Sequence, residues 1–358
     1  MDEQKVRDIL SGARRGGLWS ALRGGLWLAS KPYAAAMRLR RWAYRRGLFR
    51  SHSAGVPVIC VGNLTTGGTG KTPMAAWVVE RLKEAGCKPA ILTRGYRGIP
   101  GEGGRPGGSD EAGLLDEMTR VPIVVDGDRV AGAAKAVAGG ADVLVMDDGY
   151  QHRRLRRDLD VVLIDAVEPF GFGHCLPRGL LREPPSALAD AGAVVITHRD
   201  EAPPEEAMRL GDRLKGLAPG ASLHAAVHKP TALIDETGAV QPLEDLFGRK
   251  VYAFCGLAGP EHFFTTLSRL GARLTGRRAL ADHAVYTPRI VAELADEADR
   301  AEAKVLLTTQ KDYIKLAGLD LPRPVWQLAV AIEIASGAED LARLVRGVAQ
   351  APLSSPRT

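Results

Sequence analysis

The chain has 358 residues, of which 45% are apolar and 25% are charged, a composition that excludes a collagen-like, wholly disordered or disulfide-stapled protein. Its formal charge is +6, but residues 1–50 hold twelve Lys or Arg against three Asp or Glu, whereas the other residues hold 36 against 39. A basic head on a nearly neutral body argues against a nucleic-acid-binding groove and favours docking on an anionic surface.

The head, residues 1–50, is predicted to be an amphipathic segment that associates with a membrane. It has no apolar run of the roughly 18 residues that a spanning helix needs, and the first residues do not form a signal peptide. Leu18, Leu22 and Leu26 recur at helical spacing, with tryptophans, tyrosines and later six arginines around them. This composition suits a helix lying among lipid headgroups. The alternative is a helical hairpin packed on the body with solvated arginines.

Short apolar runs then alternate with helical patterns. Strands are expected at 56–62, 88–96, 141–149, 159–166 and 191–199, with helices at 72–86 and 129–140. Apolar runs with helices between them indicate a parallel sheet covered on both faces. We therefore predict an α/β fold whose core, residues 51–224, is a P-loop NTPase-like parallel sheet with helices on both faces.

The pattern changes near residue 225. A hairpin is expected at 228–240, followed by a strand, a turn and a helix at 250–271 and another strand within 303–316. These elements predict a smaller C-terminal α/β lobe over 225–345. The remaining residues, 346–358, are predicted to be a disordered tail.

The stretch GGTGKT predicts a phosphate-binding loop. The pattern G-x-x-x-x-G-K-[ST] requires glycine at position 65, where this chain has threonine, but the stretch still follows a strand and opens a helix. Glycines let backbone N–H groups turn toward an anion, and the helix N-terminus adds partial positive charge. The predicted ATP-binding residues are Thr65, Thr66, Gly67, Gly68, Thr69, Gly70, Lys71 and Thr72. Lys71 would reach the β- and γ-phosphates and Thr72 would hold Mg²⁺; a chance glycine-rich turn is the alternative.

A nucleotide loop needs acidic partners for the metal. Asp147 and Asp148 end an apolar strand, so they are expected at the carboxyl edge of the sheet beside the loop. We predict that Asp147 and Asp148, with Thr72, form the metal site. Asp165 ends the next strand and is a competing candidate.

Six motifs together resemble the tetraacyldisaccharide 4'-kinase, or lipid A 4'-kinase, family. They occur in the same order and are VGNLTTGGTGKTP, LTRGYRG, DDGYQHRRLRRDLD, PRGLLREP, ADHAVYT and LTTQKDYIKL. The resemblance runs from about residue 18 to 345. It implies transfer of the ATP γ-phosphate to the 4'-hydroxyl of an acylated glucosamine disaccharide 1-phosphate, giving lipid IVA, with Mg²⁺ as cofactor. It also implies a peripheral protein on the cytoplasmic face of the bacterial inner membrane. The nearly neutral body predicts no nucleic-acid partner, and the sequence indicates no obligate protein partner.

The resemblance implies the catalytic residues as well. The family's loop acid maps to Asp110, although Ser109 and Ala112 depart from the family pattern, and its histidine maps to His283, which Ala284 follows instead of a second histidine. Asp110 would accept the proton of the sugar hydroxyl with support from His283. Lys71 and Arg182 complete the expected catalytic set, Arg182 neutralising charge on the transferring group. Arg129 and Gln151 are expected to contact substrate or phosphate. Taken alone, Asp110 would more often be a helix cap.

A membrane-docked switch ATPase with a variant phosphate loop is the rival interpretation. It would share the loop, the strand-end acids and an amphipathic helix. It predicts a lysine at position 66, where this chain has threonine, and it requires no base for a sugar hydroxyl.

Overall fold

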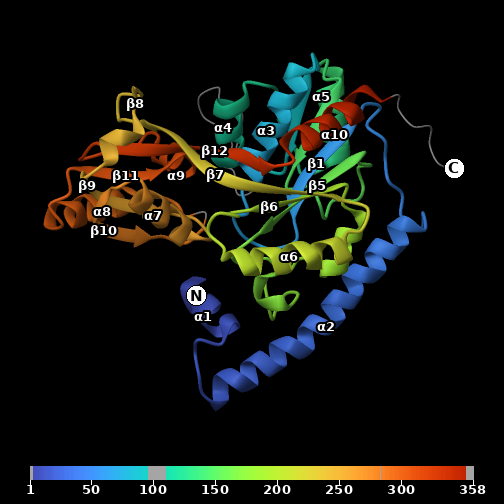
Figure 1. Ribbon diagram of the computed structural model, residues 1–358, viewed down its shortest axis with the longest axis horizontal. Helices are drawn as coiled ribbons and strands as arrows, with labels where there is room; N and C mark the ends of the chain where they lie inside the picture. Colours follow the sequence, from blue (N-terminus) through green and yellow to red (C-terminus); the bar gives the residue numbers. More distant parts are fainter. Residues whose placement is uncertain (1–2, 96–109, 283, 352–358) are drawn as a thin grey trace. The chain divides into compact units, whose positions relative to one another are not determined.

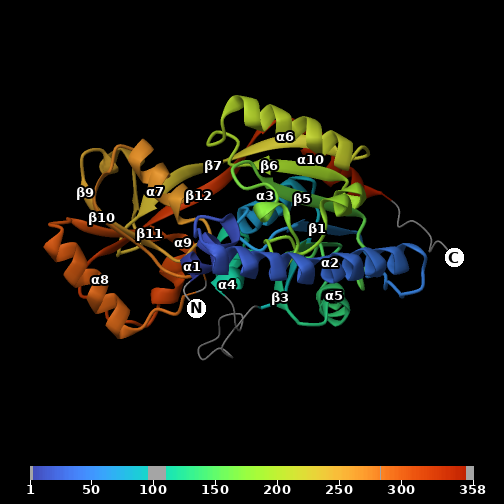
Figure 2. The ribbon, with the colours of Figure 1, turned by 90° about the horizontal axis from the view of Figure 1, so that it is seen from below.

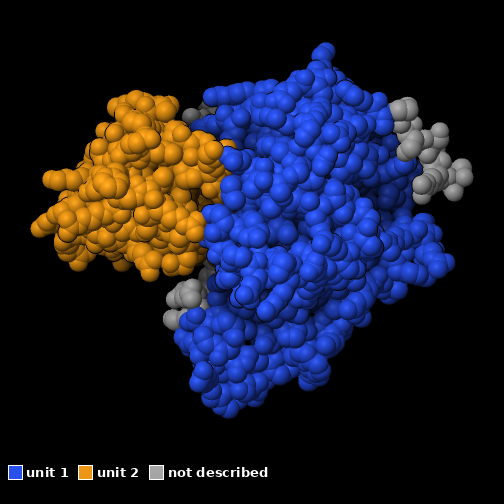
Figure 3. Space-filling model, viewed as in Figure 1, with its two compact units in different colours: residues 1–227, 332–358 blue, residues 228–331 orange. Residues whose placement is uncertain are grey.

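The computed structural model describes residues 3–95, 110–282 and 284–351 (Figure 1). The chain forms two compact units, coloured separately in Figure 3. The larger unit holds the chain up to residue 227 and again from residue 332, and the smaller unit holds residues 228–331. Two long strands, β7 (Ser222–Ile234) and β12 (Val325–Ser336), carry the chain from one unit to the other.

The larger unit is built on a parallel sheet in the order β7-β6-β5-β1-β4-β2-β3. The strands are β1 (Val58–Asn63), β2 (Pro89–Thr93), β3 (Ile123–Val125), β4 (Val143–Asp147), β5 (Leu159–Asp165) and β6 (Ala193–Thr197). Alternate residues of β1 point into two different clusters: Val58 and Cys60 into one, Ile59 and Val61 into the other. The sheet is therefore covered on both faces, which confirms the predicted fold class.

Helices on opposite faces fill these two clusters. On one face lie α3 (Lys71–Glu84), α4 (Asp110–Thr119) and α10 (Ala338–Gln350), and on the other lie α5 (Arg129–Ala138) and α6 (Pro204–Leu217). Leu341 and Val345 of α10 share a cluster with Met74 of α3, so α10 packs on the sheet of the larger unit. The smaller unit consequently ends at residue 331 instead of 345. Residues 346–350 of the expected tail belong to α10 and are helical, because α10 packs on the larger unit.

In the smaller unit the strands pair in parallel in the order β10-β9-β11-β12. Its strands are β9 (Lys250–Cys255), β10 (Arg273–Ala279) and β11 (Val305–Thr309), and its helices are α7 (Pro260–Arg269), α8 (Pro288–Arg300) and the short α9 (Gln310–Tyr313). α7 packs on one face of the sheet and α8 on the other. The expected hairpin is present, because β7 pairs antiparallel with β8 (Val240–Gln241).

The head consists of α1 (Glu3–Ser11) and one long helix, α2 (Gly17–Arg45), which runs unbroken through Gly24, Gly25 and Pro32. Figure 2 shows α2 lying along the larger unit. Tyr33 and Ala34 pack against its core. Several large apolar side chains of the helix are exposed, namely Leu18, Leu22, Trp27, Leu28, Leu39 and Trp42. By the 3.6-residue period, Leu28, Leu39 and Trp42 form an apolar face on the side of the helix opposite Tyr33. Among the described residues, no helix combines the length and the apolar character needed to cross a membrane.

Candidate active site

The phosphate-binding loop lies between β1 and α3, as the sequence predicts. Gly70 adopts the left-handed conformation (φ 82°, ψ 27°) that leads into the first turn of α3, and Met74 N–H donates to the Gly70 carbonyl. Lys71 and Thr72 therefore occupy the first turn of the helix, where free backbone N–H groups favour an anion. Lys71 Nζ lies 3.3 Å from the carbonyl oxygen of Gly67. Thr69 is buried, and its hydroxyl has no partner among the described residues.

A second segment pairs with this loop. Thr66 N–H donates to Leu180 O at 2.8 Å, and Thr65 forms an antiparallel bridge with Leu181. The next residue, Arg182, donates its own N–H to Leu64 O at 2.7 Å. These main-chain bonds hold residues 180–182, which are more than a hundred residues away in sequence, against the first half of the loop.

This pairing places the Arg182 side chain at the end of β4. Its guanidinium contacts Asp148 Oδ1 at 2.8 Å and Oδ2 at 3.1 Å, and its Nε donates to Thr65 O at 3.0 Å. It also makes a short contact with the Asn63 side-chain oxygen. A bidentate arginine–carboxylate pair fixes both groups geometrically. Arg182 thus links the phosphate loop to the acidic strand end.

The two adjacent acids have opposite electrostatic environments. Asp147 is fully buried and its Oδ1 has no partner among the described residues; burial, with the charges of Glu111 and Asp148, raises its pKa to about 7. Burial alone would raise the pKa of Asp148, but Lys71 and Arg182 outweigh it and lower that pKa to about 2. Lys71 Nζ is 3.8 Å from Asp148 Oδ1. Asp148 is therefore a paired carboxylate, whereas Asp147 has an oxygen available to a cation.

The two predicted contact residues lie beside these groups. Arg129, the first residue of α5, is buried, and it donates to Asp126 O at 2.8 Å and, at the longer distance of 3.5 Å, to Asp147 O. Its Nε has no partner among the described residues. Gln151 donates its amide to Asn63 O at 2.8 Å. The structure thus gathers Arg129, Gln151, Arg182 and both aspartates around the end of β1.

Of the predicted base, Asp110, and its histidine, His283, only Asp110 is among the described residues. Asp110 is the first residue of α4, and its neighbour Glu111 is near enough to Asp147 to raise the pKa of that group. The beginning of α4 therefore lies on the same side of the sheet as the phosphate loop. His283 lies outside the described residues.

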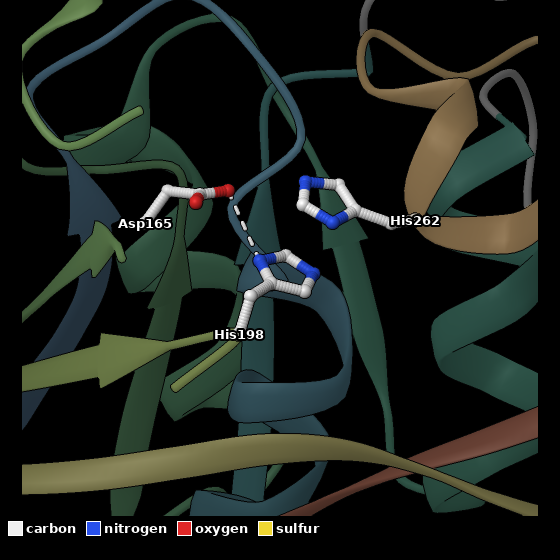
Figure 4. Close-up of side chains that lie close together, drawn as sticks. All are labelled: Asp165, His198 and His262. Carbon is white, nitrogen blue, oxygen red and sulfur yellow. Dashed lines mark hydrogen bonds and ion pairs between the residues drawn. The ribbon is translucent and has the colours of Figure 1, made fainter. Parts of the chain in front are cut away.

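Asp165, the competing candidate for the metal site, is already engaged elsewhere. Its Oδ2 lies 3.0 Å from Nδ1 of His198, as the dashed line in Figure 4 shows, and its Oδ1 accepts the N–H groups of Val167 and Glu168. It therefore holds the turn after β5 instead of facing Lys71.

Several residues of this region were not singled out from the sequence. Asn63 contacts Arg182 and the Gly67 carbonyl, and its place at the end of β1 was the available signal. Arg153, which the sequence presents as part of a basic run, is buried between Glu183 and Asp190. Asp190 also pairs with Arg41 and Arg45 of α2, a contact that no local pattern indicates.

Asp190 gives a prediction for stability. Burial alone would raise its pKa, but the Arg41 hydrogen bond and the charges of Arg153 and Arg41 lower it to about 2. The pKa of an aspartate in the unfolded chain is about 3.9. The contribution of Asp190 to the free energy of unfolding is therefore complete above about pH 4 and is lost as the pH falls toward 2. Asp190→Asn should lower the free energy of unfolding in urea at pH 7, and the gap from wild type should shrink at pH 3. Asp212→Asn, in an exposed pair, is the control; a gap that does not change with pH would contradict the assignment.

Comparisons with known proteins agree on one family. The family model LpxK, described as tetraacyldisaccharide-1-P 4'-kinase, matches residues 22–350. A protein named tetraacyldisaccharide 4'-kinase from Anaeromyxobacter dehalogenans (strain 2CP-C) is 43% identical over 323 residues, covering 85% of this chain and 84% of that protein. One of the same name from Syntrophotalea carbinolica is 37% identical, covering 84% and 85%. The "apo" form of LpxK from Aquifex aeolicus, solved in complex with ATP, is 28% identical, with a TM-score of 0.69 over 91% of this chain and 99% of that one.

Proposed function

The chain belongs to the tetraacyldisaccharide-1-phosphate 4'-kinase family, and from this membership we propose the roles of its residues in the reaction. It is an ATP-dependent lipid A 4'-kinase, which transfers the γ-phosphate of ATP to the 4'-hydroxyl of tetraacyldisaccharide 1-phosphate. The observation that carries the assignment of roles is the cluster at the end of β1, where Lys71 and Arg182 converge on Asp148.

ATP is assigned to the phosphate loop. The related Aquifex aeolicus protein was solved with ATP, and the loop residues Thr65–Thr72 here precede and open α3 in the way that phosphate binding requires. Lys71 would move from Gly67 O to the β- and γ-phosphates when the nucleotide binds. Arg182 already lies beside the loop and would neutralise charge on the transferring group.

Magnesium fits the residues at the strand end. Hard oxygen ligands suit Mg²⁺, and the fully buried Asp147 has an oxygen without a partner among the described residues. Asp147 and Thr72 would hold the ion, with Asp148 in contact directly or through water. When bound, Mg²⁺ supplies positive charge to the phosphates.

Asp110 is proposed as the base that accepts the proton of the 4'-hydroxyl, with His283 orienting it. Support comes from the placement of α4, because Glu111 is close to Asp147. Arg129 and Gln151 are proposed to contact phosphate or substrate from their positions beside Asp147 and Asn63.

The enzyme is further proposed to work on the cytoplasmic face of the inner membrane. Each buried CH₂ of an acyl chain holds the substrate in the bilayer by about 0.8 kcal/mol, so the enzyme must reach the surface. The side of α2 opposite Tyr33 offers Leu28, Leu39 and Trp42, with the exposed Arg38 and Arg46 near them. Arg41 and Arg45 pair with Asp190, so they add less to that surface than the sequence suggests.

Leu39→Glu tests this surface. The change removes a leucine that would be buried in the lipid and adds a negative charge that anionic lipids repel. Binding to vesicles of zwitterionic and anionic phospholipid should weaken by tenfold or more in a flotation assay, since about 1.4 kcal/mol corresponds to tenfold. Met208→Glu changes an equally exposed residue on α6 and should not alter flotation. Equal flotation of both variants would remove α2 as the membrane contact.

The activity itself is tested with radiolabelled ATP, Mg²⁺ and the detergent-dispersed disaccharide 1-phosphate, followed by chromatography of the lipid fraction. The label should appear on the lipid. The alternative, a switch ATPase, would release only free phosphate, and the family membership together with Thr66 in place of lysine does not favour it.

A further inference from the structure

Helix α2 contacts the active site through two side chains. The Tyr33 hydroxyl donates to the main-chain carbonyl of Arg182 at 3.0 Å, and Arg40 Nη1 donates to that of Gln151 at 3.0 Å. Both side chains are half-buried on the face of α2 that packs against the larger unit. The exposed apolar face described above plays no part in either contact.

Both carbonyls belong to residues that are themselves bonded to the phosphate loop or its strand. Arg182 donates its N–H to Leu64 O and its Nε to Thr65 O. Gln151 donates its side-chain amide to Asn63 O at 2.8 Å. Each contact from α2 therefore forms a two-bond bridge that ends on residues 63–65, at the point where β1 becomes the loop.

The helix is fixed where it makes these contacts. Arg41 Nε bonds Asp190 Oδ2 at 2.6 Å, and Arg153 Nη1 bonds the same oxygen at 3.0 Å. Arg153 in turn contacts Glu183, the residue after Arg182, at 3.4 Å. Because the members of such a buried network hold one another, the position of α2 and that of the main chain at 182–183 are coupled.

We propose that Tyr33 and Arg40 are positioning residues for phosphoryl transfer. They hold the main chain of Arg182 and Gln151 so that the Arg182 guanidinium reaches Asp148 and the loop together. This inference rests on the roles proposed above for Arg182 and Gln151. Small displacements of groups that orient a reaction reduce the rate strongly even when binding persists. The helix that carries the exposed apolar face is then also part of the active-site framework.

The test compares single changes on α2 with matched controls in the full-length enzyme. Tyr33→Phe removes only a hydroxyl, and Tyr44→Phe makes the same change on a residue whose ring contacts Phe49 and Arg40, contacts that phenylalanine keeps. Arg40→Ala removes one charge together with the Gln151 contact, and Arg23→Ala removes one charge together with a contact to the main-chain carbonyl of Arg14, on the same helix. The kcat and the KM values for ATP and lipid are measured in detergent micelles, with the thermal midpoint and vesicle flotation of each variant.

The expected result is a kcat about tenfold lower in Tyr33→Phe and Arg40→Ala, the effect of one hydrogen bond, with the KM for ATP and the thermal midpoint near wild type. Tyr44→Phe should keep the wild-type kcat, and Arg23→Ala should share any loss in flotation but not the loss in kcat. A kcat loss that follows the thermal midpoint, or that is equal in each variant and its control, overturns the inference.

Arg182→Lys, measured in the same assay, separates positioning by α2 from the proposed role of Arg182 on which it rests. A strongly impaired Arg182→Lys together with an unaffected Tyr33→Phe overturns positioning by α2 and leaves the role of Arg182 standing. Near-wild-type kcat in Arg182→Lys overturns the role of Arg182 itself, and with it the reason for positioning it.

Discussion

Replacing Lys71 with alanine should lower kcat/KM for phosphoryl transfer by about 10³-fold. In the structure Lys71 Nζ stands between the Gly67 carbonyl, at 3.3 Å, and Asp148, at 3.8 Å, at the first turn of α3. That places its charge where the β- and γ-phosphates of ATP would lie. Removing a single preorganised group that stabilises charge in a transition state typically costs 10²–10³ in rate, and here the nucleotide affinity is lost as well.

The measurement is a steady-state assay of lipid phosphorylation over a range of ATP concentrations. Lys83→Ala is the matched control, because Lys83 is on the same helix but pairs with Glu80 and lies away from the loop. The thermal midpoint of Lys71→Ala should stay close to wild type, since Lys71 is bonded to one carbonyl and to a carboxylate that Arg182 also holds. Activity in Lys71→Ala within tenfold of wild type would show that the loop does not hold the nucleotide as proposed.

The parts of the site that the sequence predicts are those set by local pattern. A glycine-rich stretch between an apolar strand and a helix specifies the loop, and two acids at the end of a second strand must meet it, because the carboxyl ends of parallel strands share one edge. β1, α3 and β4 accordingly occupy their predicted positions. The hairpin expected at 228–240 is equally local, and β7 and β8 form it.

The parts that the sequence does not predict depend on contacts across long stretches of chain. The Arg182 fork reaches Asn63 and Asp148 only because Thr66 and Leu180 pair their main chains. Asp190 gathers arginines from α2 and from the run at 153–157, which by composition alone looks like a solvated basic segment. The different states of Asp147 and Asp148 likewise follow from burial and neighbours, since adjacent identical residues carry no sequence signal for which one is paired.

That difference gives the second large prediction: Asp147→Asn should nearly abolish transfer while making the metal-free protein more stable. Asp147 is fully buried with one oxygen lacking a partner among the described residues, and burial with neighbouring acids raises its pKa to about 7. A buried carboxylate without a partner is costly, so a neutral amide of the same size removes a penalty. The same change removes an oxygen proposed to hold Mg²⁺, and we expect kcat to fall by 10²-fold or more.

Two measurements check this trade-off, and Asp148→Asn is the comparison. Without added metal at pH 8, Asp147→Asn should have a higher thermal midpoint than wild type, whereas Asp148→Asn should have a lower one because it breaks the paired contact with Arg182. The Mg²⁺-induced rise in the midpoint should be much smaller in Asp147→Asn than in wild type. If Asp147→Asn is destabilised as strongly as Asp148→Asn and keeps the Mg²⁺-induced rise, the unpartnered oxygen serves the fold and not the metal, and the ion must be held elsewhere at the strand end.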